Sequence, residues 1–145
     1  MMLRTLIITA TLCLLPITIP IELSTKRLPT KEQIIQETYK YKNQKLLVAI
    51  IEVESNFNTL AKSNKNAIGL TQIRPAIWRE QLIENNIIRN DFCLYNHKKN
   101  IKSSVHILSK LEKRYNGNLE KMMNHYSGDR TGRYYKKVIN KMKKS

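Results

Sequence analysis

Two glutamates near the end of a predicted helix are the residues best suited to acid–base chemistry. The helix covers about residues 47–55 and contains Glu52 and Glu54. Because an α-helix turns roughly 100° per residue, these side chains project about 200° apart and cannot form one carboxylate pair. Glu54 lies on the apolar stripe of the helix, in register with Leu47, Ile50 and Ile51. Glu52 lies on a mixed face that we expect to be more polar.

A carboxyl group on an apolar stripe has two possible explanations. Burying it as an unpaired charge costs several kcal/mol, so Glu54 can be paired with a lysine or arginine, or reach solvent at the helix end. Alternatively, partial burial raises the pKa of the carboxyl, which then stays protonated near neutral pH and can donate a proton. The helix pattern alone leaves both explanations open.

The residues around and after Glu54 form an ordered series of motifs. They are Glu54-Ser55-Asn56-Phe57-Asn58, Ala61, Ser63, Ala67, Gly69-Leu70-Thr71-Gln72-Ile73, Pro75, Leu94, Asn100-Ile101, Leu108, His125-Tyr126-Ser127-Gly128, Tyr134 and Val138. In this order and register, over roughly residues 33–140, the chain resembles the lytic transglycosylase domain of the soluble type (SLT), which is related to goose-type lysozyme.

The resemblance implies roles for five residues. Glu54 would be the catalytic carboxyl, and Ser55, Gly69, Gln72 and Tyr126 would contact the substrate. Tyr126 would also face Glu54 and orient it through its hydroxyl. Purely structural roles compete with each substrate contact: Ser55 and Gln72 can hold the loop, Gly69 can serve a turn, and Tyr126 can belong to the core. Trp78 is expected in the core rather than as a sugar-stacking platform.

The implied reaction needs one carboxyl, although glycoside cleavage normally employs two. Protonated Glu54 would donate to the glycosidic oxygen between N-acetylmuramic acid (MurNAc) and N-acetylglucosamine (GlcNAc), and would then accept the proton of the muramoyl 6-hydroxyl as it attacks C1. The product is a 1,6-anhydro-MurNAc end. No cofactor is expected, and no metal, because His97, His106 and His125 have no ligand spacing.

Three other functions compete with this one. A muramidase would hydrolyse the same bond with water, with Asp129 as the carboxyl that folding could bring close. A non-catalytic cell-wall-binding module is the second alternative, and a nucleic-acid or membrane binder is the third and weakest.

The chain departs from the family pattern at several positions. Thr71 replaces a methionine, Asn66 and Ser104 replace glycines, and Asn96-His97 replaces Asp-Pro. Ser127 replaces an asparagine, with one residue missing before Gly128. This last departure bears on sugar contacts from that loop and leaves Glu54 unaffected.

Helices are the only regular elements that the apolar periodicity predicts, so the fold class is all-α, a small lysozyme-like domain. Thr30 is the predicted N-cap of the first helix and Pro75 lies in the first turn of the third. The expected apolar stripes contain Ile34, Ile35 and Tyr39; Leu47, Ile50 and Ile51; Ile77, Leu82 and Ile83; Ile101, Val105, Leu108 and Leu111; Leu119, Met122, Met123 and Tyr126; and Tyr134, Val138 and Met142.

The N-terminal segment is typical of an export signal. Arg4 lies at the start of an apolar run from Leu3 to Ile21, which predicts a signal peptide over residues 1–24 and a catalytic domain over residues 25–145. An uncleaved membrane anchor is the alternative. The protein is therefore expected in the periplasm, the cell envelope or the extracellular space. Removal of Cys13 with the signal would leave Cys93 without a disulfide partner.

A formal net charge of +15 predicts an anionic partner. Seven basic residues concentrate between Arg130 and Lys144, on the last predicted helix. They can attach the protein to an anionic cell-wall polymer or surface, or can simply form a solvated face. The expected partners are peptidoglycan glycan strands, contacted by a monomer, alone or within a secretion, conjugation or phage apparatus. Nucleic acid is not expected.

Overall fold

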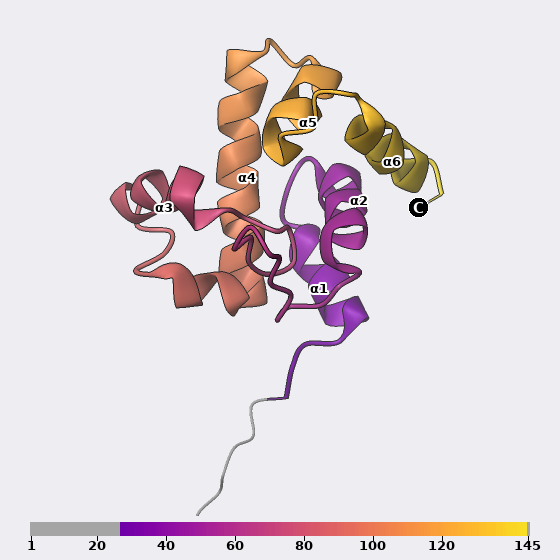
Figure 1. Cartoon of the computed structure of the whole chain (residues 1–145). Coiled ribbons are helices and arrows are strands. Elements are labelled where there is room, and N and C mark those ends of the chain that lie inside the picture. The colour runs from indigo at the N-terminus through magenta and orange to yellow at the C-terminus, as the bar shows by residue number, and fades with distance from the viewer. Residues whose placement is uncertain (1–26, 145) are drawn as a thin grey trace, which may run out of the picture.

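The computed structural model describes residues 27–144, and its regular elements there are helices (Figure 1). They are α1 (Lys31–Thr38), α2 (Gln44–Ser55), α3 (Pro75–Glu84), the 3-10 helix η1 (Asp91–Tyr95), α4 (His97–Arg114), α5 (Leu119–Ser127) and α6 (Arg133–Met142). Between α2 and α3, isolated β-bridges join Ile68 to Lys62 and to Ile73. The all-α prediction is confirmed. The predicted signal segment, residues 1–24, lies outside the described residues.

Side chains flanking the helices explain where they begin. Thr30 and Gln33 form a reciprocal capping box at the start of α1, and Pro75 occupies the first turn of α3, both as predicted. Asn96 and Asn118 accept backbone N–H groups at the starts of α4 and α5. Each cap satisfies donors that the first helical turn leaves without partners.

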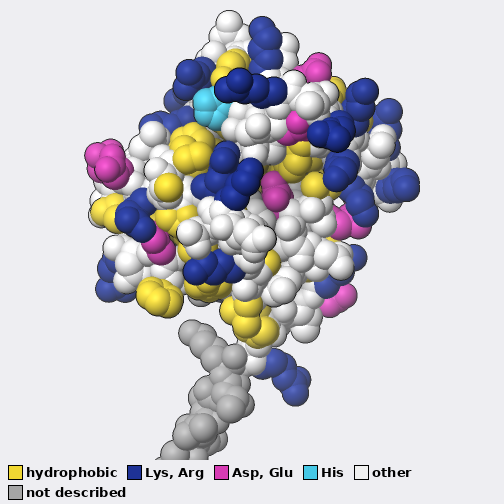
Figure 2. Space-filling model, viewed as in Figure 1, with side chains coloured by type: hydrophobic (Ala, Val, Ile, Leu, Met, Phe, Trp, Pro, Cys, Tyr) yellow, Lys and Arg dark blue, Asp and Glu magenta, His cyan; other side chains and the backbone are white. Residues whose placement is uncertain are grey.

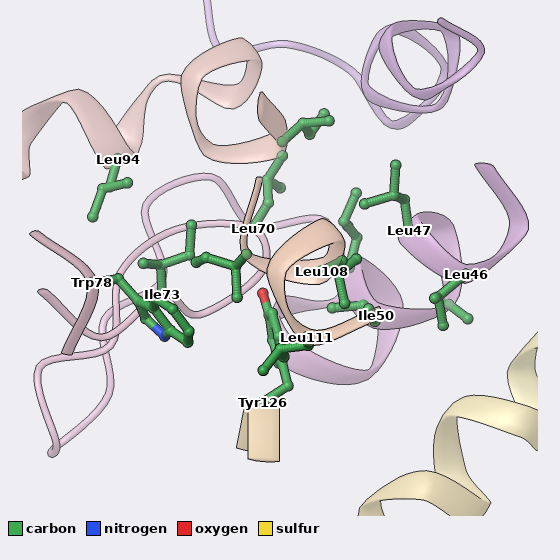
Figure 3. Packing of buried hydrophobic residues seen from close by; sticks show 14 of the residues in the cluster. Leu46, Leu47, Ile50, Leu70, Ile73, Trp78, Leu94, Leu108, Leu111 and Tyr126 are labelled. Atoms are coloured by element: carbon green, nitrogen blue, oxygen red, sulfur yellow. The ribbon is translucent and has the colours of Figure 1, made fainter. Parts of the chain in front are cut away.

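The helices pack around α4, which runs through the middle of the molecule (Figure 1). The α1 helix packs against α4 and α2, α5 packs against α4 and α6, and α6 lies along α2. Figure 3 shows the core formed where these elements meet the loop that follows α2. Its labelled members are Leu46, Leu47, Ile50, Leu70, Ile73, Trp78, Leu94, Leu108, Leu111 and Tyr126.

Three residues assigned to apolar stripes are exposed instead. Tyr39, Ile77 and Ile83 have 57%, 47% and 40% of their surface accessible. The α3 helix lies at the side of the molecule and buries only the narrow line of Pro75, Trp78 and Leu82. Its two isoleucines project beside that line, so the prediction that they face the core is wrong. Among residues 27–144, no helix is long and apolar enough to cross a membrane.

Candidate active site

Glu54 lies in the last turn of α2, at the edge of the hydrophobic core. Every residue from Leu46 to Ile51 is buried, so the helix that carries Glu54 is fixed on all sides. The helix ends at Ser55, where Asn56 and Phe57 both adopt positive φ angles of 48° and 65°. Such angles are uncommon for residues with side chains, especially bulky ones. The sharp turn directly after the helix leaves Glu54 half-buried at its end.

The surroundings of Glu54 raise the pKa of its carboxyl. Burial is the largest cause, because it disfavours the charged form. The hydroxyl of Tyr134 and the positive charge of Arg74 act in the opposite direction, and burial outweighs both. Tyr134 comes from α6 and Arg74 from the residue before α3, so three distant parts of the chain meet here. A carboxyl with this environment is suited to donating a proton near neutral pH.

The Tyr134 hydroxyl lies close to the Glu54 carboxyl. It influences the pKa of Glu54 as a hydrogen-bonding neighbour does, yet makes no hydrogen bond of normal geometry within the described chain. Burial and the neighbouring Glu54 carboxyl raise the pKa of Tyr134 itself, which keeps its hydroxyl protonated. The hydroxyl is therefore a buried donor beside the Glu54 carboxyl.

The Tyr126 hydroxyl makes its hydrogen bonds to groups other than Glu54, although the charge of Glu54 acts on its pKa, and its predicted contact with substrate stays a prediction. Its hydroxyl donates to the carbonyl oxygen of Thr71 at 2.9 Å and pairs with the Ser104 hydroxyl at 3.1 Å. The side chain is buried in the core (Figure 3), and burial raises its pKa. The reason is packing: α5 lies against α4 and directs Tyr126 inward, whereas α6 lies along α2 and brings Tyr134 to the glutamate.

The loop that follows α2 is held by buried polar side chains. Asn100 on α4 donates to the carbonyl oxygens of Ile68 and Leu94, at 3.0 and 2.8 Å. It accepts from the N–H and the hydroxyl of Thr71 at 3.0 and 2.8 Å. The Thr71 carbonyl in turn accepts from Tyr126, which pairs with Ser104. Thr71 and Ser104, two departures from the family pattern, thus belong to one connected network.

Gly69 is required by internal packing. It has a φ of +77°, and a Cβ atom there would lie 2.3 Å from both the Asn100 amide nitrogen and the Leu94 carbonyl oxygen. No side chain fits in that space, so the turn alternative accounts for the glycine. Its predicted backbone contact with a sugar stays a prediction.

Gln72 and Ser55 make local hydrogen bonds. The Gln72 amide donates to the carbonyl oxygens of Ala61 and Gly69 at 3.3 and 3.0 Å, which ties the loop to itself. The Ser55 hydroxyl donates to the Ile51 carbonyl at 3.2 Å, inside α2. Both residues therefore perform the structural roles that competed with substrate binding, and their sugar contacts are untested.

The other candidate carboxyls are held by different partners. On the face of α2 that carries Glu52, which we expected to be more polar, Val48 and Ala49 are buried, and Lys141 of α6 pairs with Glu52 at 2.6 Å. Asp129 accepts from the Thr131 N–H and hydroxyl and from the Tyr134 N–H, so it caps the start of α6.

Arg79 donates to the Asp91 carboxylate, with 2.8 Å between Nε and Oδ1. Glu52, Asp91 and Asp129 therefore all have hydrogen-bonding or charged partners within the described part of the chain. Within residues 27–144 there is also no group of three potential metal ligands. Trp78 is buried, as expected for a core residue.

Sequence reasoning gave no role to two residues of the site. Tyr134 was assigned only to the apolar stripe of the closing helix. Arg74 stands between Ile73 and Pro75, the one charged residue inside that motif, and its charge was the signal available. Neither neighbour of Glu54 could be identified without the tertiary contacts.

Comparison with known families gives one match. Residues 32–144, well over half of the chain, match the model of the transglycosylase SLT domain. No curated protein and no solved structure matches the chain.

Proposed function

The chain belongs to the transglycosylase SLT family, and from this premise we propose that it is a peptidoglycan lytic transglycosylase with Glu54 as its single catalytic carboxyl. Family membership implies a lysozyme-like fold and cleavage of glycosidic bonds in peptidoglycan. The proposal adds the bond, which is the β-1,4 link between MurNAc and GlcNAc, and the product, which is a 1,6-anhydro-MurNAc end.

The half-buried position of Glu54 is the observation that carries the proposal. Because burial raises its pKa, the carboxyl can hold a proton and give it to the glycosidic oxygen while the bond from that oxygen to C1 breaks. The oxygen of the muramoyl 6-hydroxyl then bonds to C1, and the ionised Glu54 carboxylate accepts the proton that this hydroxyl loses. Glu54 ends protonated again, and no water is consumed. The substrate's own acetamido group can stabilise the positive charge at C1 between the two steps.

The partners of the remaining carboxyls support a mechanism with one glutamate. Hydrolases that invert or retain configuration need a second carboxyl to activate water or to form a covalent intermediate. Glu52 is paired with Lys141, Asp129 caps α6, and Asp91 is paired with Arg79. The Tyr134 hydroxyl and the Arg74 charge are the polar neighbours that would stabilise the ionised form of Glu54 between the steps.

Product analysis tests this function. Mass spectrometry of the muropeptides released from purified peptidoglycan should show anhydro ends. The Glu54→Gln variant should fold and lose at least about a hundredfold of the release rate, the scale of lost general-acid catalysis, whereas Glu52→Gln should lose far less. Reducing ends would identify a muramidase instead, and wall binding without any release would identify a binding module.

We propose further that the protein is exported and that α6 attaches it to an anionic wall polymer or surface. Lys and Arg side chains gather over α6 in Figure 2. Arg130, Arg133, Lys136, Lys137, Lys143 and Lys144 are exposed, while Lys141 is partly covered in its pair with Glu52. An exposed basic helix beside the site would hold the protein near its substrate.

A further inference from the structure

Arg74 is a charged side chain beside Glu54 that no carboxylate of the described chain pairs with. It directly precedes α3, and its charge acts on both Glu54 and His125. Its guanidinium lies against Gly128, with Nη2 and Nη1 at 3.3 and 3.6 Å from where a Cβ would stand. In residues 27–144 it is in neither a salt bridge nor a side-chain hydrogen bond. It therefore stands between the ends of α2 and α5 with its donors unused.

A basic pocket adjoins Arg74 at Gly128. Its volume is about 430 Å³, and it is lined by Tyr115, Lys121, Asn124, His125, Gly128, Asp129 and Arg130. Lys121 and Arg130 are exposed. Asp129 is the one carboxylate of this lining, and both of its oxygens accept hydrogen bonds from Thr131 or Tyr134. Lys121 and Arg130 therefore give this pocket an excess of positive charge, and the Asp129 carboxylate is already hydrogen-bonded to other residues.

The fold does not explain why an arginine is needed at this position. An arginine that stabilises a fold usually gives its five donors to carbonyls or carboxylates. Arg74 gives none of them, although it is partly buried and sits within a tightly held segment whose neighbours Ile73 and Pro75 are both buried. Unused donors of this kind, beside Gly128 and close enough to act on the charge of Glu54, are available to a ligand.

We propose that Arg74 and the pocket at Gly128 form a subsite for a carboxylate of the peptidoglycan strand, next to Glu54. This inference rests on the proposed function. A guanidinium binds carboxylates through two parallel N–H groups, which gives both affinity and orientation. A muramoyl residue without peptide offers its lactyl carboxylate, and a residue with peptide offers the carboxylates of the stem. A strand whose carboxyl groups are blocked offers neither.

Binding measurements in the Glu54→Gln background, where strands are not cleaved, test the subsite. The three probes are peptide-free GlcNAc–MurNAc hexasaccharide, the same hexasaccharide with its lactyl carboxyls converted to amides, and a peptide-bearing hexasaccharide. Adding Arg74→Gln should weaken binding of a carboxylate-bearing probe about tenfold, the scale of a charge-assisted hydrogen bond, and leave the amidated probe within about twofold. Arg74→Lys should restore part of the loss.

The probes also identify the source of the carboxylate. If Arg74→Gln weakens binding of the peptide-free strand, the subsite binds the lactyl carboxylate. If Arg74→Gln weakens binding of the peptide-bearing strand alone, the subsite binds a carboxylate of the stem peptide. Arg89→Gln, which removes the same charge from an exposed loop, is the matched control and should change nothing.

Two results would overturn the subsite: an equal loss on the amidated strand, or unchanged binding of both charged strands. Cleavage of purified peptidoglycan by the unmodified protein is measured separately, so either result would leave the proposed function standing.

Discussion

Glu54 and Tyr134 are 80 positions apart in the sequence and are neighbours in the structure, across the contact between α2 and α6. The hydroxyl of Tyr134 lowers the pKa of a carboxyl that burial raises. Tyr126, the tyrosine of the His125-Tyr126-Ser127-Gly128 motif, donates its hydroxyl to the Thr71 carbonyl. Removing the Tyr134 hydroxyl should therefore change the pKa of Glu54, whereas removing the Tyr126 hydroxyl should change mainly the stability of the fold.

The Tyr134→Phe variant should move the pH dependence of cleavage. Removing the hydroxyl removes an influence that lowers the pKa of Glu54, so the pKa should rise further. A general acid works while it is protonated, and the alkaline decline of kcat/KM should shift to higher pH. Stability should change little, because the lost hydroxyl has no hydrogen bond of normal geometry.

Tyr126→Phe is the matched control for that experiment. It deletes two buried hydrogen bonds and should lower the free energy of unfolding by about 1–2 kcal/mol without shifting the pH profile. If the two variants moved the profile equally, Tyr134 would have no specific influence on Glu54.

Glu54→Gln should stabilise the fold at neutral pH. The folded-state pKa of Glu54 is raised, so its contribution to stability is fully present below its unfolded pKa and is lost as pH rises through the folded value. Glutamine cannot ionise and avoids this loss. Thermal unfolding should therefore give a higher Tm for the variant at pH 7 and equal values near pH 3. A variant that is less stable at pH 7 would contradict the burial of this carboxyl.

Asp129→Asn should weaken the start of α6 rather than abolish turnover. Hydrogen bonds from Thr131 and Tyr134 lower the pKa of Asp129 to about 2. Its stabilising contribution is therefore present above its unfolded pKa and is lost as pH falls through about 2. The variant should have a lower Tm at pH 7, with the difference disappearing in acid.

Turnover of Asp129→Asn, measured well below that Tm, should stay within about tenfold, a barrier change of about 1.4 kcal/mol. Complete loss of activity in a folded variant would identify Asp129 as a second catalytic carboxyl.

Retention on anionic cell wall should fall as salt rises. Exposed charges are largely screened beyond about 8 Å at physiological ionic strength, so attraction to the basic residues of α6 weakens with added salt. Replacing Lys136 and Lys137 together by glutamine should lower retention at low salt. The same replacement at Lys98 and Lys102, exposed on α4, should have less effect. Equal retention of both pairs at every salt concentration would assign the charge to solubility.

Local features of this fold could be predicted from the sequence because their causes are local. Thr30 and Pro75 mark helix starts through their own chemistry, and the register of Leu47, Ile50 and Ile51 places Glu54 at the core boundary. The ordered motifs pointed to the family that the comparison identifies.

The neighbours of Glu54 depend on how whole helices pack against one another. The spacing of apolar residues along the sequence does not predict that packing. Tyr126 and Tyr134 both lie on amphipathic helices, and only the contact of α6 with α2 decides which hydroxyl reaches the carboxyl. The same contact brings Lys141 to Glu52. The position of Arg74 beside Glu54 likewise depends on tertiary packing, because it lies close both to Glu54 on α2 and to Gly128 at the end of α5.

The distance along the chain between α2 and α6 has a consequence for protein synthesis. A ribosome completes Glu54 long before it reaches Tyr134, and domains generally fold as units once their sequence is available. Until α6 docks, Glu54 lacks Tyr134 as a neighbour and Glu52 lacks its partner Lys141. The surroundings that set the pKa of Glu54 are therefore completed only when α6 packs against α2.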